Sequence, residues 1–489
     1  MTAPPVLRSS RISNASPVAV LLGLLLLPVA LVGPNVTEVA YAAVVLAVGL
    51  TILWRPAEPP IPLLIFGYQW IQAAMGPIYG NLSGLALNDL SRNLGEHNLA
   101  AWLELTGVLC LALGMRWAIG NRDFDLHRRV IAFVGSRPLG FWFRIYLTAS
   151  IFGALCATFA YSAGGLVQPL LSLSQIKWAG YILLTFSAFA IRGNPKGIWI
   201  AVTLFEFVLS VGGFFSTFKD IFFYAALGLV GSGYRFRAPQ LIIFTALASL
   251  LLPLGVVWSA VKIPYRDFVN GRTLQQSVNA GYTERIGYLG TLIGNLDRPA
   301  LAEGLDTLAR RVMYFEFFGA TIGNVPENVP HTGGAIWGRA IAASFMPRLI
   351  FTSKAPVHDS ELTRQYSGIR VSSYEQGTSI SMGYLAEAYI DFGAVLMFVP
   401  ILLLGAGFGF IYRWLLSRSG RDGVIGAALS TFTLMPANAI ETSVLKMIPA
   451  VLLCVVACLI IFKFIAPLIW GVSQPPTAAA AHKPRLAGG

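Results

Sequence analysis

The chain has 489 residues, of which 55% are hydrophobic and only 12% are charged, against about 25% charged in a typical soluble domain. Charged residues this sparse cannot cover the surface of a soluble protein of this length, which excludes that class. The formal net charge of +12 is typical of cytoplasmic loops of a membrane protein, and no basic stripe with interleaved aromatic residues indicates nucleic-acid binding.

The first half of the chain is a series of apolar segments, most of them long enough to cross a hydrocarbon layer of about 30 Å. Residues 1–16 precede them and form a basic tail, which we predict to be cytoplasmic. Residues 17–258 are predicted to form nine transmembrane helices, at 17–33, 37–54, 60–78, 99–118, 144–163, 178–191, 197–215, 220–233 and 239–258.

Residues 259–382 interrupt this series with a segment too polar to span a membrane, and we predict a long periplasmic loop with short helices. One helical pattern covers residues 301–318, where apolar side chains recur at Leu301, Leu305, Leu308 and Val312. Loops of this length are mostly binding or catalytic elements. The loop is therefore where we expect function.

Three further transmembrane helices are predicted within residues 383–468, at 383–412, 423–440 and 446–466, and residues 469–489 read as a flexible cytoplasmic tail. The sequence thus predicts an all-α, polytopic integral membrane protein with about twelve transmembrane helices. Basic loops stay in the cytoplasm, which indicates that both termini are cytoplasmic. In this topology the short outer segments carry only four basic residues, which are Arg92, Lys177, Lys219 and Lys446.

Basic residues in the long loop are candidates for binding an anion. They include Arg311, Arg339, Arg348 and Lys354, and Arg348 lies within the apolar run 345–351. Guanidinium groups suit bidentate recognition of phosphate. The alternative is that these side chains reach lipid headgroups or pair with nearby carboxylates. For the cluster as a whole we favour anion binding.

Lys219 lies with Asp220 in a short outer turn that has almost no polar flanks. Such a position suits a further phosphate contact at the membrane face. A plain break between two helices at the interface explains the same residues equally well.

Acidic residues mark the start of the tenth predicted span. Glu387 and Asp391 are four residues apart and so share one helix face. Carboxylates at the end of an apolar helix are costly unless they face a polar cavity or pair with cations. We interpret Glu387, His331 in the loop and Asp391 as catalytic candidates, with Glu387 the first choice for a general base and His331 the second. The two acids either include this base or together orient the arginines of the loop. The alternative is a plain pair of interfacial charges.

The four cysteines all fall in apolar runs, and we find no metal-ligand spacing and no nucleotide-binding or hydrolase motif. We therefore predict no metal site and no cofactor.

Two motifs resemble those of bacterial Wzy-type oligosaccharide repeat-unit polymerases. Residues 339–356 contain Met-Pro-Arg…Ser-Lys-Ala-Pro, similar to the family's Pro-Arg…Lys-Pro loop signature, although Ala355 separates the last two residues. Residues 383–393 read Gly-Tyr-Leu-Ala-Glu-Ala-Tyr-Ile-Asp-Phe-Gly, similar to the family's Glu-x-Tyr-x-Asn-Phe-Gly signature, with Asp391 in place of the common Asn.

The resemblance implies a GT-C-like, metal-independent glycosyltransferase of the bacterial inner membrane. It would join repeat units carried on undecaprenyl diphosphate at the periplasmic face, and a chain-length regulator and a flippase are the implied partners. Cations are then expected to stabilise the diphosphate leaving group, with Arg311, Arg339, Arg348, Lys354 and Lys219 as candidates.

Two other functions stay open at this point. A flippase or other transporter of lipid-linked oligosaccharides also fits twelve spans, but the long loop and the lack of internal repeats speak against it. An O-antigen ligase-like transferase would use the same donor and a similar loop.

Overall fold

The computed structural model describes residues 15–471 except for 56–57, 161–162, 164–165, 192, 211–218, 235–237, 272–279, 347–358, 372–378 and 419–421. All regular secondary structure in these residues is helical. The first twelve helices precede the ninth predicted span. They are α1 (Ala15–Leu24), α2 (Leu27–Leu31), α3 (Val36–Leu53), α4 (Ile61–Ser83), α5 (Leu87–Leu90), α6 (His97–Ile119), α7 (Leu126–Val134), α8 (Leu139–Ala160), α9 (Val167–Ser174), α10 (Lys177–Ala190), α11 (Gly197–Ser210) and α12 (Asp220–Gly231).

The remaining helices cover the ninth predicted span, the long loop and the C-terminal part of the chain. They are α13 (Ala238–Val269), α14 (Tyr282–Gly294), α15 (Arg298–Val312), α16 (Phe315–Asn324), α17 (Ala335–Ser344), α18 (Asp359–Ser367), α19 (Tyr384–Leu396), α20 (Phe398–Leu416), α21 (Asp422–Leu434), the 3₁₀ helix η3 (Met435–Ala437), α22 (Val444–Ile460), the π-helical turn η4 (Ile461–Ile465) and α23 (Ala466–Gly471).

Five stretches of helix in the described residues are long and apolar enough to cross a membrane. They are Val36–Leu53, His97–Ile119, Leu139–Ala160, Phe398–Leu416 and Val444–Leu468. Large apolar side chains are exposed along several helices, for example Leu204, Phe205 and Val208 of α11. Such a surface is unfavourable in water and favourable against lipid. The chain is therefore a helical membrane protein.

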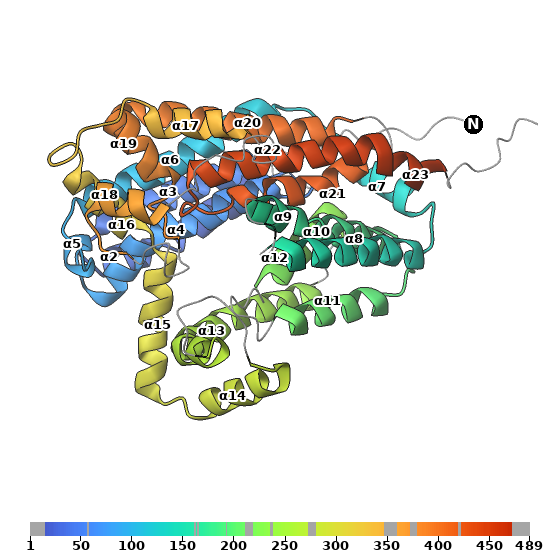
Figure 1. Ribbon diagram of the computed structural model, residues 1–489, viewed down its shortest axis with the longest axis horizontal. Coiled ribbons are helices and arrows are strands. Elements are labelled where there is room, and N and C mark those ends of the chain that lie inside the picture. Colours follow the sequence, from blue (N-terminus) through green and yellow to red (C-terminus); the bar gives the residue numbers. More distant parts are fainter. Residues whose placement is uncertain are drawn as a thin grey trace, which may run out of the picture.

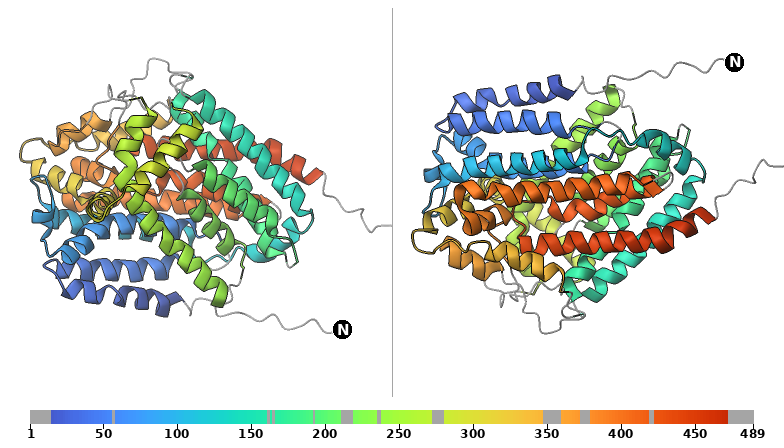
Figure 2. Two further views of the ribbon diagram at one scale, coloured as in Figure 1. Left: turned by 90° about the horizontal axis from the view of Figure 1, so that it is seen from below. Right: turned by 90° about the horizontal axis from the view of Figure 1, so that it is seen from above.

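Most helices form one bundle of roughly parallel rods. In the right-hand view of Figure 2, α1, α3, α6 and α20 lie in a row, and their contacts follow the same order. Helix α4 packs against both α3 and α6, while α8, α10 and α21 extend the bundle on the side of the green helices in Figure 1. One continuous apolar core joins these helices.

Helices α13, α14 and α15 form an arm beside this bundle, and α15 runs at a steep angle to the main helices (Figure 1). The arm has its own small core between α13 and α14. Asp306 of α15 ties the arm to the bundle, because its Oδ1 accepts a hydrogen bond of 2.9 Å from Tyr79 of α4. Its Oδ2 accepts another of 2.9 Å from Arg310.

A helix lies at each of the twelve predicted spans, but several boundaries differ from the prediction. The span expected at 17–33 is divided into α1 and α2, and the span expected at 239–258 continues in α13 to Val269. The pattern at 301–318 is split between α15 and α16, because Met313 is extended and both Met313 and Tyr314 turn into the core.

The tenth predicted span, 383–412, is also divided. Gly393, inside α19, has φ 73° and ψ 179°, a non-helical conformation that kinks the helix there, before α20 begins at Phe398. The eleventh, expected at 423–440, ends as an α-helix at Leu434 and continues through η3 into a partly buried connection at 438–443. Both breaks occur where the acidic residues of α19 lie.

Candidate functional site

The acidic segment α19 is covered by helices of the long loop. Both α16 and α17 contact α19, and α18 contacts α16. In Figure 1 these four helices lie together at one end of the bundle. The loop and the start of the tenth predicted span therefore form one structural unit.

Glu387 is buried, with 1% of its surface exposed, and it lies at the N-terminus of α22. Its Oε2 accepts a hydrogen bond of 2.8 Å from the backbone N–H of Val444, the first residue of that helix. The positive end of a helix dipole favours a carboxylate at this position. The backbone N–H of Val444 thus gives the buried Glu387 side chain a hydrogen-bond donor.

A second carboxylate meets the same helix end. Asp359 of α18 is buried, accepts a hydrogen bond of 3.1 Å from Ser443 Oγ, and has Oδ2 at 2.6 Å from Nζ of Lys446. One helix terminus and one lysine therefore hold both Glu387 and Asp359. Asp359 and Lys446 were not predicted as site residues.

Asp391 makes a different set of contacts, at the N-terminus of α17. Its carboxylate accepts hydrogen bonds from the backbone N–H groups of Ile336 (3.1 Å) and Trp337 (2.8 Å) and from the hydroxyl of Thr332. The N–H groups in the first turn of a helix have no acceptor within the helix, and Asp391 supplies one for two of them. Asp391 therefore positions the loop helix α17 on α19.

His331 precedes α17 and is exposed to solvent. Its Nδ1 lies 3.1 Å from the carbonyl oxygen of Ile390, and its ring packs edge-on against Tyr389 at 5.5 Å. A carbonyl can only accept, so Nδ1 carries the proton and Nε2 is left as the hydrogen-bond acceptor. An exposed imidazole with a fixed tautomer and a free acceptor nitrogen is suited to take up a proton.

Behind Glu387 lies a layer of buried polar side chains. Tyr384 donates a hydrogen bond of 2.7 Å to Gln69 Oε1, and Gln69 in turn donates one of 2.8 Å to the carbonyl of Ala437. Gln72 accepts a hydrogen bond of 2.8 Å from the backbone N–H of Ile440. These side chains of α4 and α19 hold the connection 438–443 inside the bundle.

Two titratable side chains of α6 are buried without a hydrogen-bond partner in the described part of the chain. They are Glu104, which is 0% exposed, and His97. They are seven residues apart and so lie on the same face of the helix. Sequence reasoning missed Glu104, although a lone acid within the apolar run of α6 was a signal that could have identified it.

The structure describes three of the five predicted cations, and it does not bring them together. Arg311 lies near the end of α15, Arg339 is exposed on α17, and Lys219 lies in the turn before α12. The ammonium group of Lys219 is 3.1 Å from the hydroxyl of Tyr68. Arg348 and Lys354 fall in 347–358, outside the described residues.

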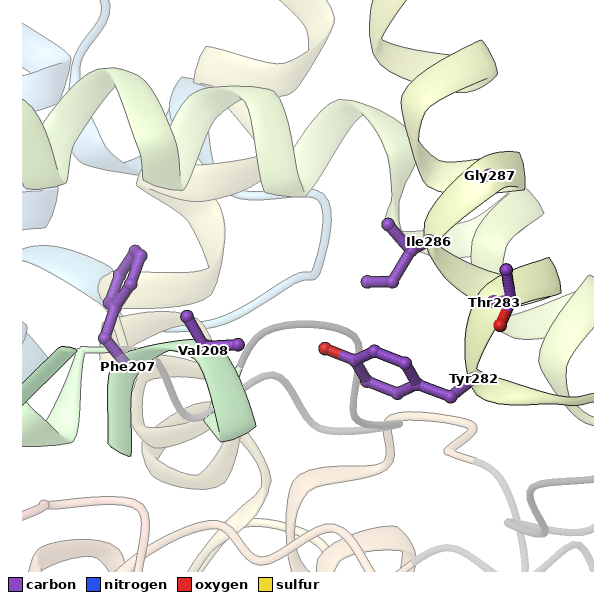
Figure 3. Close-up of a pocket in the computed structure, with 6 residues that line it drawn as sticks. All are labelled: Phe207, Val208, Tyr282, Thr283, Ile286 and Gly287. Atoms are coloured by element: carbon purple, nitrogen blue, oxygen red, sulfur yellow. The ribbon is translucent and has the colours of Figure 1, made fainter. Parts of the chain in front are cut away.

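One open cleft lies away from these residues, between α11 and α14 (Figure 3). Its volume is about 610 Å³. Tyr282 and Ile286 of α14 extend toward Phe207 and Val208 of α11 across the gap. None of the predicted site residues that the structure describes lines it.

Among the described residues, no group of three or more histidine, cysteine, aspartate or glutamate side chains is arranged to hold a metal ion. The carboxylates of the site are instead held by helix ends and by Lys446.

A family model described as a domain of unknown function, DUF8712, matches residues 141–419, which is more than half of the chain. The chain belongs to this family. The DUF8712 segment begins in α8 and ends just after α20, so it contains the arm, the described loop helices and both carboxylates of α19. No curated protein and no solved structure matches the chain.

Proposed function

We propose that the chain is a glycosyltransferase of the bacterial inner membrane that joins oligosaccharide repeat units carried on undecaprenyl diphosphate at the periplasmic face. The observation that carries this proposal is the joining of the long loop to α19. Asp391 anchors the segment of His331 and Arg339, and Asp359 anchors α18 beside Glu387. Residues 347–356 of the first motif lie outside the described residues. The helix that leads into it, α17, is held against the second motif on α19, and this contact supports the proposal.

The topology in this proposal has twelve spans with both termini in the cytoplasm and the loop outside. It is supported by the placement of the first and last helices. Figure 2 shows that α1 begins and α23 ends toward the same end of the bundle. The loop helices α16 to α19 lie at the opposite end in Figure 1.

In the proposed reaction, the hydroxyl oxygen of one lipid-linked unit forms a bond to the anomeric carbon of the growing chain. The bond from that carbon to the diphosphate oxygen breaks, and undecaprenyl diphosphate leaves with the bonding electron pair. The hydroxyl proton passes to a base. Nε2 of His331 is better placed for this role than Glu387, because it is exposed and its other nitrogen is already bound.

Arg339 follows His331 in the same anchored segment and is exposed. We assign it to the diphosphate, whose negative charge grows as the bond breaks. Glu387 then acts through its bond to the first turn of α22, by holding the site together.

The test is to express His331→Gln, Arg339→Ala and Glu387→Gln in cells that lack the wild-type protein and to measure polymer length at equal protein level. Loss of a general base typically lowers a rate by about 10²–10⁴-fold, so His331→Gln should leave single repeat units. The matched control is Glu327→Gln, an exposed residue of the same segment, which should retain full polymer. Wild-type length in all three site variants would overturn the proposal.

Transport of lipid-linked oligosaccharide is the second candidate, and the unpartnered His97 and Glu104 favour it. Ionisable residues inside membrane helices often mark transport pathways or proton relays. Deletion of the chain separates the functions. Single units exposed outside indicate a polymerase, units trapped inside indicate a flippase, and uncapped lipid A cores beside normal polymer indicate a ligase.

A further inference from the structure

Helices α13 and α15 of the arm cross at very short range. A Cβ atom added to Gly304 would lie 2.7 Å from the carbonyl oxygen of Val256, and one added to Gly255 would lie 3.1 Å from Cδ2 of Leu308. Glycine at these two positions allows the backbones to approach closely. This close approach fixes how α13 and α15 lie against each other.

Three cations lie on the faces that meet at this crossing. Lys262 and Arg266 follow Gly255 by seven and eleven residues, and Arg311 follows Gly304 by seven, so each lies on the contact face of its helix. Lys262 and Arg266 are half-buried, whereas Arg311 is exposed. A ligand can reach the cluster from the side of Arg311.

The three positive charges act on one another. The pKa of Lys262 is lowered to about 8, by burial first and then by Arg311 and Arg266. The pKa of Arg266 is lowered as well, by burial and by Arg311. Among the described residues, neither Lys262 nor Arg311 forms an ion pair. An anion bound between them would relieve this repulsion.

The surroundings of the cluster are apolar and open. Ile263, next to Lys262, is 70% exposed, and Leu305, one and a half turns before Arg311, is 46% exposed. Trp258 and Tyr265 stack edge to face one turn away. Cations, aromatic rings and exposed aliphatic side chains at the end of a long apolar helix are typical of the headgroup region of a bilayer.

We propose that Lys262, Arg266 and Arg311 form a binding site for the phosphate of a membrane lipid. The guanidinium groups suit the phosphate oxygens as paired donors, and the lysine adds a point charge. The exposed apolar side chains would contact the acyl chains of the lipid. A free phosphate ion has no such chains, so these contacts favour a lipid over inorganic phosphate. The site does not depend on the proposed transfer reaction, because it lies on α13 and α15 of the arm, whereas the carboxylates proposed to hold the transfer site lie on α18 and α19.

The experiment uses the full chain purified in a nonionic detergent, and measures its melting temperature and its lipid adducts by native mass spectrometry. The probes are phosphatidylglycerol, undecaprenyl diphosphate, diacylglycerol without a phosphate, and inorganic phosphate. The two phosphate-bearing lipids should bind and stabilise the protein, and diacylglycerol should not. In the variant Lys262→Gln, Arg266→Gln, Arg311→Gln, the affinity should fall about ten-fold or more, as expected for the loss of charge-assisted bonds.

The matched control is Arg298→Gln, an exposed arginine at the other end of α15, which should bind lipid like the wild type. Arg311→Gln alone serves if the triple variant does not fold. Equal lipid binding by the wild type and these variants would overturn the inference, and so would binding of inorganic phosphate as tight as that of the lipids. Wild-type polymer length in the His331, Arg339 and Glu387 variants, together with the lipid binding expected here, would count against the proposed function only.

Discussion

Asp391 shows how the surroundings of one carboxylate decide its role. In the sequence it stands on the same helix face as Glu387, which suggested a shared acidic site. In the structure the two side chains serve different helices, since Asp391 binds the start of α17 and Glu387 binds the start of α22. Each carboxylate satisfies backbone donors that would otherwise be buried without partners.

Replacement of Asp391 by alanine should therefore release α17. The variant loses bonds to Ile336, Trp337 and Thr332, and we expect destabilisation by about 2–4 kcal/mol. The melting temperature of the purified protein and the protease sensitivity of residues 326–346 measure this loss. Asp89→Ala, at an exposed position of α5, is the control and should melt like the wild type. Equal melting temperatures of both variants would show that the hydrogen bonds of Asp391 to the start of α17 contribute nothing to stability.

Lys262 makes the free energy of unfolding depend on pH. Its pKa of about 8 in the folded chain lies below its ordinary value of 10.5, so its charge destabilises the folded state below about pH 8. Between about pH 8 and 10.5 it loses its proton first in the folded state, and its contribution to the free energy of unfolding rises. The charged groups that face it are Arg266 on α13 and Arg311 on α15.

Melting curves from pH 7.5 to 10 check this. The melting temperature of the wild type minus that of Lys262→Gln should increase as pH rises through this window. A difference that is constant with pH would contradict the assignment of the shifted pKa to Lys262.

At the scale of elements, the most extensive contact among the described helices joins α6 and α20. Gly405 and Gly409 of α20 are four residues apart, and their faces touch the backbone of α6 at Leu111 and Met115. This small-xxx-small spacing lets two membrane helices approach closely without a cavity.

Valine at position 405 should push these helices apart, because its side chain would collide with the carbonyl of Leu111. Overpacking of this kind costs about 1–3 kcal/mol. We expect a lower melting temperature and a lower yield of monodisperse protein after detergent extraction. Gly407→Ala is the matched control, since Gly407 faces open space on the same helix. If both variants behave like the wild type, the contact is looser than the structure indicates.

At the scale of the whole molecule, the topology has a direct test. Cysteine introduced at Glu327 in the loop should react with a membrane-impermeant maleimide in intact cells. Cysteine at Arg128, an exposed residue of α7, should react only after permeabilisation. The wild-type chain is the blank, because Cys156, Cys454 and Cys458 are buried and Cys110 is partly buried. The opposite labelling pattern would place the loop in the cytosol and remove the proposed site.

The sequence by itself determines the class of this protein and the position of its helices. Runs of apolar residues require a lipid environment, and a backbone in lipid must satisfy its hydrogen bonds within a helix. For this reason a helix lies at every predicted span, even where Gly393 divides one or where α13 continues beyond Trp258.

Only the tertiary structure decided which side chains meet. The sequence does not encode directly that Glu387 and Asp359, 28 positions apart, share the start of α22, or that Lys262 and Arg311 meet where two helices cross. Such pairings depend on crossing angles and on where helices break, and these are set by packing over the whole molecule rather than by local pattern. Glu104 differs, since a lone acid in an apolar run already marks it in the sequence. The structure adds that its side chain is buried and has no hydrogen-bond partner among the described residues.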